Sequence, residues 1–360
     1  MNPVELYDVV STIVNHLTLE IRLRRVLKYF SLGVLVSRSC LLDDVAQALT
    51  PLGTKDSQYR RLQRFLANPR VTVANLQREW ASIVVQAMQP TSLTLLVDET
   101  ALSKHLKIMV VGIWTPGGCV PVAWRCYHPD QYPACGQVNL IVDLLDRIRP
   151  VLPFPLPIQL LADRGIGTSP DLIRKVEDRS IQVLFRVQGS TRFRYPDGRI
   201  VALRDLGMKG YVWQAPGDVF KKAKWLSLYA TVACDKDYEH PWCLVSSDPI
   251  EAQTYGLRFD QEGCFRDFKS DGFQWHRSHI WLPDHTDRLL LVVSISYWVV
   301  MAVGQSQPPV TKGRAARWSD FRRGLEVFKS LFHPTIVSIL PTTVLTRSSR
   351  PPPRITYVVQ

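Results

Sequence analysis

The residues best suited to chemistry in this chain are one carboxylate and three neighbours whose spacing fits a helix. Tyr255, Arg258, Glu262 and Lys269 are separated by gaps of two, three and six residues. At about 100° per residue, a single helix would carry all four side chains within about 60° of one another. We therefore expect one helix face to present a carboxylate flanked by two cations. A solvated face with an ordinary salt bridge is the alternative interpretation of a Glu and an Arg four residues apart.

Two more carboxylates each follow an apolar run of strand length. Residues 94–97 lead to Asp98, and residues 158–162 lead to Asp163. We expect each Asp to lie at the C-terminal end of its strand, so that two strands deliver two acids to one sheet edge. Either Asp alone is also compatible with a turn or helix-cap role. The acid on the later helix favours a shared site.

The segments around these acids alternate between strand and helix patterns. The expected strands are 107–114, 120–127 and 181–187, and the expected helices are 139–149 and 170–179. With the two strands that end in Asp residues, the order becomes strand, strand, strand, helix, strand, helix, strand. This order predicts an α/β fold with a mixed sheet flanked by helices.

At this point the chain resembles the DDE transposases of bacterial insertion sequences, in the subgroup marked by Tyr-x2-Arg-x3-Glu-x6-Lys around its catalytic glutamate. The matching pieces are Val97-Asp98-Glu99-Thr100, Ala162-Asp163-Arg164-Gly165 and the segment from Tyr255 to Lys269. The resemblance covers most of residues 20–300. It implies an RNase H-like fold with Asp98, Asp163 and Glu262 as the metal-binding catalytic triad.

The chemistry of such enzymes explains why three acids are needed. DNA strand cleavage and transfer displace one phosphate oxygen by another in line, and two divalent ions about 4 Å apart stabilise both oxygens. Carboxylates suit hard ions such as Mg²⁺ or Mn²⁺. We expect two ions per active site, with Asp98 bridging both while Asp163 and Glu262 each complete one.

The resemblance also assigns the remaining signature residues. It implies that Tyr255, Arg258 and Lys269 contact the DNA backbone and support the active site. Arg266 faces the same side of the expected helix and is a further candidate. Positive charge at these positions would hold a phosphodiester beside clustered acids. The alternative is that Arg258 only neutralises Glu262 one turn away.

About 100 residues separate Asp163 from Glu262, more than a compact RNase H-like fold needs. The alternating patterns and many Lys and Arg residues in 190–247 predict a basic β-rich insertion before the last catalytic helix, as the resemblance also implies. The insertion contains Trp213, Trp225 and Trp242. In relatives an insertion Trp is thought to receive a flipped base when DNA ends form hairpins. A structural role is the alternative for each of the three.

Residues 1–90 have the pattern of a helical region that binds DNA ends. The expected helices are 4–17, 19–29, 42–49, 57–67 and 73–88. Arg60 and Arg64 are one turn apart beside Arg61, a spacing that suits DNA phosphates or a groove. Similar Arg-rich helices precede the catalytic core in relatives. A solvated basic face is the alternative.

The C-terminal part begins with an apolar segment and then changes composition. Residues 289–303 are almost entirely apolar, but a membrane span needs about 20 such residues, so we expect a buried helix beneath the catalytic sheet and no membrane. Residues 304–360 are rich in Pro, Ser, Thr and basic residues. They predict a loosely ordered tail that contacts DNA or a partner subunit, or that only aids solubility.

Composition agrees with this interpretation. The chain has 360 residues, 46% of them hydrophobic, enough for a full core in two or three modules. A net charge of +12 favours a polyanionic partner. Seven Cys without a Cys-x-x-Cys pair favour a reducing compartment and no zinc module. The chain shows no signal-peptide pattern and no Gly-rich phosphate loop, so we expect a bacterial cytoplasmic, nucleoid-associated protein without a nucleotide cofactor.

The expected organisation has four parts. Residues 1–90 bind DNA ends, residues 91–189 and 248–303 form the catalytic domain, 190–247 is the insertion and 304–360 is the tail. The resemblance implies a homodimer that cleaves and joins double-stranded DNA at the inverted-repeat ends of its own insertion sequence and at a target, by cut-and-paste transposition through hairpin intermediates. The alternatives are an RNase H-like DNA nuclease without strand transfer and a domesticated DNA-binding repressor.

Overall fold

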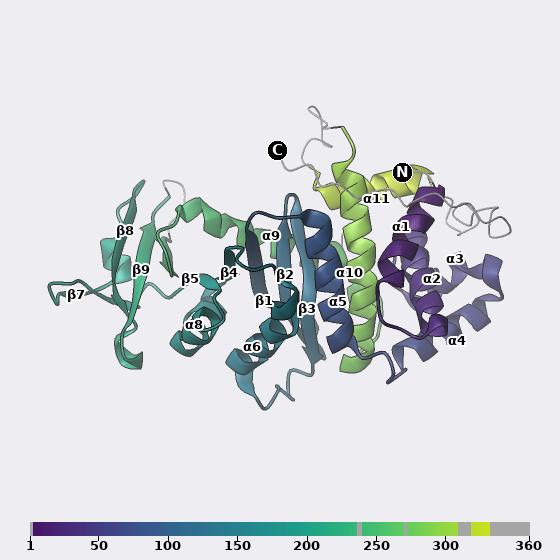
Figure 1. Cartoon of the computed structure of the whole chain (residues 1–360), viewed down its shortest axis with the longest axis horizontal. Coiled ribbons are helices and arrows are strands. Elements are labelled where there is room, and N and C mark those ends of the chain that lie inside the picture. Colours follow the sequence, from purple (N-terminus) through teal and green to yellow (C-terminus); the bar gives the residue numbers. More distant parts are fainter. Residues whose placement is uncertain (1–2, 236–239, 270–271, 309–317, 332–360) are drawn as a thin grey trace.

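A mixed β-sheet of ten strands runs through the part of the chain that the structure describes. The structure is a computed structural model, and it describes residues 3–235, 240–269, 272–308 and 318–331. The strand order is β3-β2-β1-β4-β5-β10-β9-β8-β6-β7. Helices pack around this sheet, so the protein has an α/β fold, as the sequence predicts (Figure 1).

The strands before the insertion form one half of the sheet. They are β1 (Leu93–Ser103), β2 (Leu106–Thr115), β3 (Gly118–Tyr127), β4 (Ile158–Ala162) and β5 (Gln182–Arg186). Strands β1, β4 and β5 are parallel, whereas β2 is antiparallel to both β1 and β3. The interior of β2 and nearly all of β3 are buried. The sequences of these strands are therefore almost continuously apolar instead of alternating between apolar and polar residues.

Strand β1 is longer than the sequence predicts, and Asp98 lies in its middle instead of at its end. Its parallel pairing with β4 stops at Val97, opposite Ala162. Beyond that point β1 continues to Ser103, paired with β2. The polar residues after Val97 suggested a strand end, but they are supported by the long antiparallel partner. Asp98 thus lies where the neighbouring strand β4 ends, and Asp163 directly follows β4.

The insertion extends the same sheet. Its strands are β6 (Arg192–Arg194), β7 (Ile200–Ala202), β8 (Val212–Val219), β9 (Leu226–Ala233) and β10 (Trp242–Ser246). Strand β10 pairs antiparallel with β5, so the insertion and the first half of the sheet share backbone hydrogen bonds. Figure 1 shows β7, β8 and β9 at one end of the molecule and the N-terminal helices at the other.

Most of the described helices either precede the sheet in the sequence or pack against strand β3. The N-terminal ones are α1 (Pro3–Asn15), α2 (Ile21–Ser37), α3 (Leu42–Ala48), α4 (Lys55–Leu66) and α5 (Val73–Met88), and those within the first half of the sheet are α6 (Gly136–Ile148), α7 (Arg164–Gly167) and α8 (Pro170–Glu177). Helix α2 runs eight residues beyond its expected end at residue 29. Residues 30–36 are buried all round, so no helical periodicity marks them.

Helix α10 (Pro283–Gln305) is the expected buried helix. It packs against edge strand β3, α2 and α11. It is long and apolar enough to cross a membrane, but 89% of its most apolar window is buried inside the fold, as in the core helix of a soluble protein. Near its start, the buried Arg288 donates to the carbonyls of Leu66 at 2.7 Å and Val71 at 3.1 Å. This side chain therefore ties the N-terminal helices to α10.

The region after α10 contains a helix that the sequence analysis missed. Helix α11 (Asp320–Leu331) packs closely along α10. A Cβ added at Gly304 would lie 1.8 Å from the carbonyl oxygen of Asp320, and one at Gly324 would lie 2.0 Å from that of Val300. Glycine at both positions lets the two backbones approach. Part of the expected loose tail is thus helical, and its segments 309–317 and 332–360 lie outside the described residues.

Candidate active site

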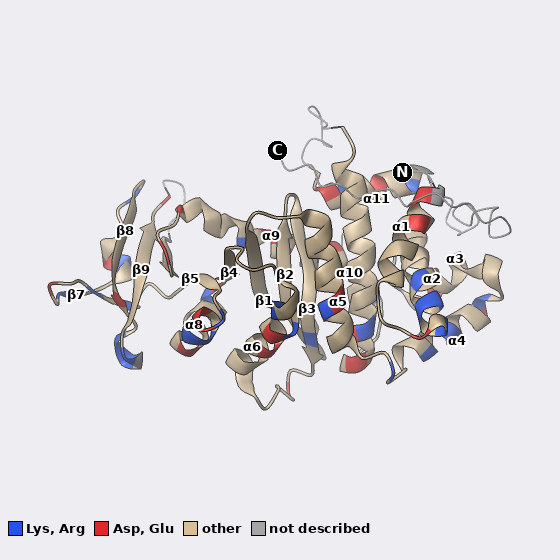
Figure 2. Ribbon diagram, in the orientation of Figure 1, with Lys and Arg blue, Asp and Glu red and all other residues tan. Residues whose placement is uncertain are grey.

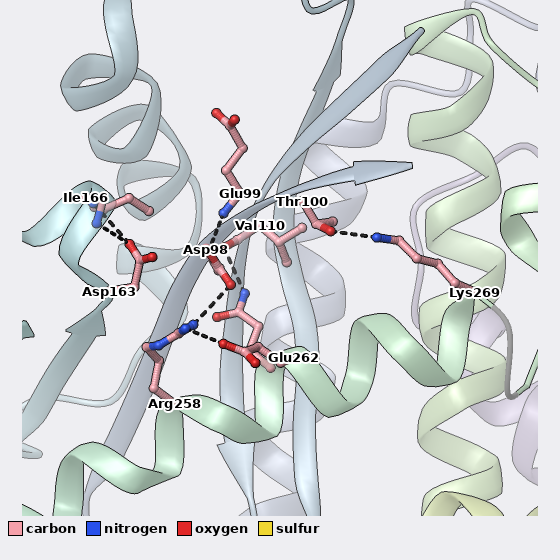
Figure 3. A network of polar contacts seen from close by, with 11 residues as sticks. Asp98, Glu99, Thr100, Val110, Asp163, Ile166, Arg258, Glu262 and Lys269 are labelled. Carbon is pink, nitrogen blue, oxygen red and sulfur yellow. Dashed lines mark hydrogen bonds and ion pairs between the residues drawn. The ribbon is translucent and has the colours of Figure 1, made fainter. Parts of the chain in front are cut away.

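The three predicted acids come from different elements that meet at one place. Asp98 is on β1, Asp163 follows β4 and Glu262 is on α9 (Phe259–Phe268). Since Val97 pairs with Ala162, the next residues, Asp98 and Asp163, emerge from neighbouring strands. Helix α9 contacts β1, β2 and β3. Figure 3 shows Glu262 on this helix, beneath Asp98.

Arg258 connects two of these acids. Its Nη1 donates to Oδ2 of Asp98 at 3.1 Å, and its Nη2 donates to Oε1 of Glu262 (Figure 3). The Arg258 side chain is 9% exposed and that of Asp98 is 15% exposed, whereas that of Glu262 is 51% exposed. Arg258 therefore does more than neutralise Glu262 one turn away, because the same guanidinium also binds the acid on β1.

Asp98 has the most perturbed environment of the three. Burial raises the pKa of its carboxyl to about 6, Arg258 opposes this rise, and the nearby charges of Asp163 and Glu262 add to it. The backbone N–H of Glu99 also donates to Asp98, at 2.8 Å. A carboxyl that is partly desolvated beside two other acids is typical of a functional site.

Asp163 has the cap role considered for it and also lies near Asp98. Its Oδ1 accepts hydrogen bonds from the backbone N–H groups of Gly165 at 2.9 Å and Ile166 at 3.1 Å, so it caps the short helix α7. Its charge also acts on Asp98. The cap fixes the carboxylate beside β1, which makes the structural role a support for the functional one.

The signature residues do not share one α-helix, contrary to the sequence prediction. Tyr255 and Arg258 belong to a 3-10 helix, η5 (Ala252–Arg258), Glu262 belongs to α9, and Lys269 is the residue that ends α9. A 3-10 helix has about three residues per turn, so Tyr255 and Arg258 point to the same side of η5, and this side is buried.

Tyr255 consequently lies in the interior. Its side chain is 1% exposed, and its ring packs against those of Trp242 and Phe259 with centroids 5.2 and 6.5 Å away. Burial raises the pKa of its hydroxyl to about 12. The expected contact with the DNA backbone does not fit this position. Tyr255 instead anchors the start of the signature in the core.

Lys269 and Arg266 lie further along α9. The Lys269 Nζ donates to Oγ1 of Thr100 at 2.7 Å, two residues beyond Asp98 on β1 (Figure 3). Burial lowers the pKa of this ammonium, and the charge of Asp98 opposes the effect. Arg266 is exposed on the same helix. The structure thus brings Lys269 to the strand that carries Asp98.

Two residues that the sequence analysis missed hold α9 on the sheet. Asp260 accepts a hydrogen bond from Nε1 of Trp114 at 2.7 Å. Gln261 is fully buried, and its Nε2 donates at 3.2 Å to the carbonyl of Val110, the residue paired with Asp98 across β1 and β2. Gln261 therefore fixes Glu262 at the register position of Asp98. A polar side chain on the apolar side of α9 was the available signal.

The three insertion tryptophans differ in their surroundings. Trp242 contacts the signature segment through Tyr255 and Phe259. Trp213 packs against Phe193 and Tyr195 within the insertion. Trp225 has the guanidinium of Arg194 over its ring, 4.5 Å from the centroid. All three rings are half-buried, and Trp242 is the one packed on the candidate active site.

The predicted basic residues of the N-terminal region lie on another part of the molecule. Arg60, Arg61 and Arg64 are exposed on α4. This helix packs mainly against α2, α3 and α10, and not against the strands that carry the acids. Figure 2 shows basic residues along α2 and α4 at the end of the molecule opposite the insertion.

The acids fit a divalent cation by donor type. Three carboxylates supply the hard oxygen ligands that Mg²⁺ and Mn²⁺ prefer, and burial together with the charges of the other two acids raises the pKa of Asp98. As they stand, no three His, Cys, Asp or Glu side chains of the described residues are grouped as metal ligands. Arg258 lies between Asp98 and Glu262, so this guanidinium would have to release a carboxylate for them to share a cation.

Comparison with known proteins adds no family assignment. No protein-family model matches the chain, and no curated protein is significantly similar to it.

Proposed function

We propose that this chain is a metal-dependent DNA transposase of the DDE type, which cleaves and joins double-stranded DNA at the ends of its insertion sequence. The observation that carries the proposal is the convergence of Asp98, Asp163 and Glu262, from three separate elements, around one guanidinium. Three acids near a single buried Arg leave excess negative charge, which is costly unless a further cation is held there.

The strand arrangement supports an RNase H-like catalytic domain. Three antiparallel strands, β1 to β3, are followed by β4 and β5, which lie parallel to β1 and are reached through helices. Asp98 lies on the central strand β1, and Asp163 lies at the end of its neighbour. In open sheets with parallel strands, ligands bind beyond the carboxyl ends of those strands, where both acids are found.

Each group has a distinct task in this proposal. Asp98, Asp163 and Glu262 would hold Mg²⁺ or Mn²⁺, which when bound would stabilise charge on the attacking and leaving phosphate oxygens. Arg258 offsets the repulsion among the acids while no cation is held. Lys269, which donates to Thr100 two residues beyond Asp98, would bind the phosphodiester at the acids.

The charge distribution supports DNA as the partner. The chain carries a net charge of +12, and the exposed arginines of α4 lie apart from the acids. A duplex could therefore be gripped at one place and cut at another. We propose that the protein acts as a homodimer on two DNA ends, in the bacterial cytoplasm at the nucleoid, through hairpin intermediates.

The test uses the DNA that flanks the gene, including its inverted repeats. The wild-type chain with Mg²⁺ should nick this DNA and join the free 3′ ends to a target. Asp98→Asn, Asp163→Asn and Glu262→Gln should each abolish cleavage while binding of the same DNA is retained. Cleavage that survives any of these changes would exclude that residue from the triad. Cutting without joining would support a nuclease, and binding without cutting would support a repressor.

A further inference from the structure

Helices α3 and α4 form a compact helix–turn–helix unit. They pack against each other and are joined by a short turn in which Gly53 has φ +146°. Helix α4 begins at Thr54, whose side chain accepts a hydrogen bond from the N–H of Ser57 at 3.3 Å. Units of this kind place their second helix in the major groove of DNA. Helix α4 occupies that second position.

The two faces of α4 are clearly separated. The inner face, buried against the neighbouring helices, consists of Gln58, Leu62, Phe65 and Leu66. The outer face is exposed, and four of its residues line an open hollow of about 500 Å³: Arg60, Gln63, Arg64 and Ala67. The lining thus combines the short side chain of Ala67 with three long polar ones.

Donor groups on this outer face remain available for a ligand. Within the described residues, the side chains of Arg60 and Gln63 make no hydrogen bond or ion pair, and Arg64 uses only Nε, which donates to the Arg60 carbonyl at 3.1 Å. Arg61 differs, because its Nη1 donates to Oε1 of Gln58 at 3.2 Å. Two guanidiniums and one amide therefore point outward from one concave face.

We propose that α4 is a recognition helix that reads base edges in the major groove of duplex DNA, with Arg60 and Arg64 on guanines and Gln63 on an adenine. An arginine fork matches the two acceptors of guanine, and a glutamine amide matches the acceptor and donor of adenine. The Gln63 amide could also donate to a phosphate, but only a base edge offers the paired acceptor and donor that use both of its groups. The inference rests on the proposed function, since it specifies how a DNA end is recognised.

The test is selection from a randomised duplex pool by the full chain without divalent cations, so that no strand is cut. The wild type should enrich one motif that contains guanine and adenine. Gln63→Ala should relax selection at the adenine and weaken binding of the preferred duplex by about 5- to 100-fold, with an unchanged salt dependence because no charge is lost. Gln63→Arg should shift that position from adenine to guanine.

Arg61→Ala is the matched control. Arg61 lies outside the hollow, so its loss should weaken binding to all sequences alike and lower the salt slope by about 1. The proposal is overturned if the wild type enriches no motif, or if Gln63→Ala leaves the motif unchanged. It is equally overturned if every variant weakens binding uniformly. Cleavage is measured separately with Mg²⁺, so a failure of base reading is distinguished from a failure of the proposed catalysis.

Discussion

Replacing Asp98 by Asn should stabilise the metal-free protein while it abolishes cleavage. The Asp98 carboxyl is buried beside Asp163 and Glu262, and these effects outweigh Arg258 and raise its pKa from 3.8 to about 6. A buried charge of this kind is retained for function at the expense of stability. Asparagine has nearly the same shape and keeps one oxygen to accept from Arg258, but it carries no charge.

The size of the effect follows from the pKa. A rise from 3.8 to about 6 corresponds to about 3 kcal/mol, because each tenfold change in the dissociation constant is worth about 1.4 kcal/mol. The folded state binds its proton more tightly than the unfolded state, so wild-type stability falls as the pH rises from about 4 to about 6. Above that range the Asp98→Asn variant should exceed the wild type by up to about 3 kcal/mol, and near pH 4 the difference should vanish.

The assay is urea unfolding of both proteins with EDTA across this pH range. Asp163→Asn is the matched control, because it removes one charge from the same site while Asn caps a helix about as well as Asp. Its stability should change by less than about 1 kcal/mol. Added Mg²⁺ should stabilise the wild type and not the Asp98→Asn variant. An Asp98→Asn protein that is no more stable than the wild type at about pH 8, or a difference that does not depend on pH, would refute the reasoning.

Three further predictions concern buried contacts. Gln261→Leu should leave the free energy of unfolding nearly unchanged, because Oε1 of this buried residue has no partner within the described residues. The same change should lower the cleavage rate by about 10- to 100-fold, because Glu262 would be displaced. Equal cleavage rates would contradict this. Arg288→Met should cost about 2 to 4 kcal/mol in urea unfolding, since it orphans the carbonyls of Leu66 and Val71. Gly324→Ala should detach α11 from α10, because a Cβ would lie 2.0 Å from the Val300 carbonyl, and limited proteolysis should then cut near α11; an unchanged digestion pattern would count against it.

Local sequence patterns predicted those elements whose burial is one-sided or whose ends carry clear signals. The helix expected at 73–88 is α5 with the same bounds, and β4 coincides with the strand-length run at 158–162. The end of α2 was missed because that segment is buried on all sides. Helix α11 was missed although its buried residues Phe321, Leu325 and Phe328 have helical spacing. The Pro, Ser and Thr content of residues 304–360 as a whole hid this short amphipathic segment.

In the candidate site, too, local patterns predicted some residues and missed those that depend on distant contacts. The three acids could be found because each follows a recognisable strand or lies in a spaced segment. The spacing predicted that Tyr255 and Arg258 share a face, but it could not show that this face is buried. Gln261 was overlooked because its importance depends on Val110, a partner 151 residues away. Residue type and spacing identified the chemistry, whereas the supporting contacts required the fold.

The structure gives the signature spacing a different physical meaning from a shared helix face. Tyr255 comes first and anchors the segment against Trp242 of the insertion. Three residues later, Arg258 stands at the junction of η5 and α9, where one guanidinium reaches both Glu262 and Asp98. Lys269 comes as the helix ends and reaches β1 beyond Asp98. The gaps therefore place an anchor beside Trp242 of β10, and then a counter-charge, an acid and a cation beside β1. A change in the Arg258 to Glu262 spacing would separate the counter-charge from the acids and leave their repulsion unbalanced.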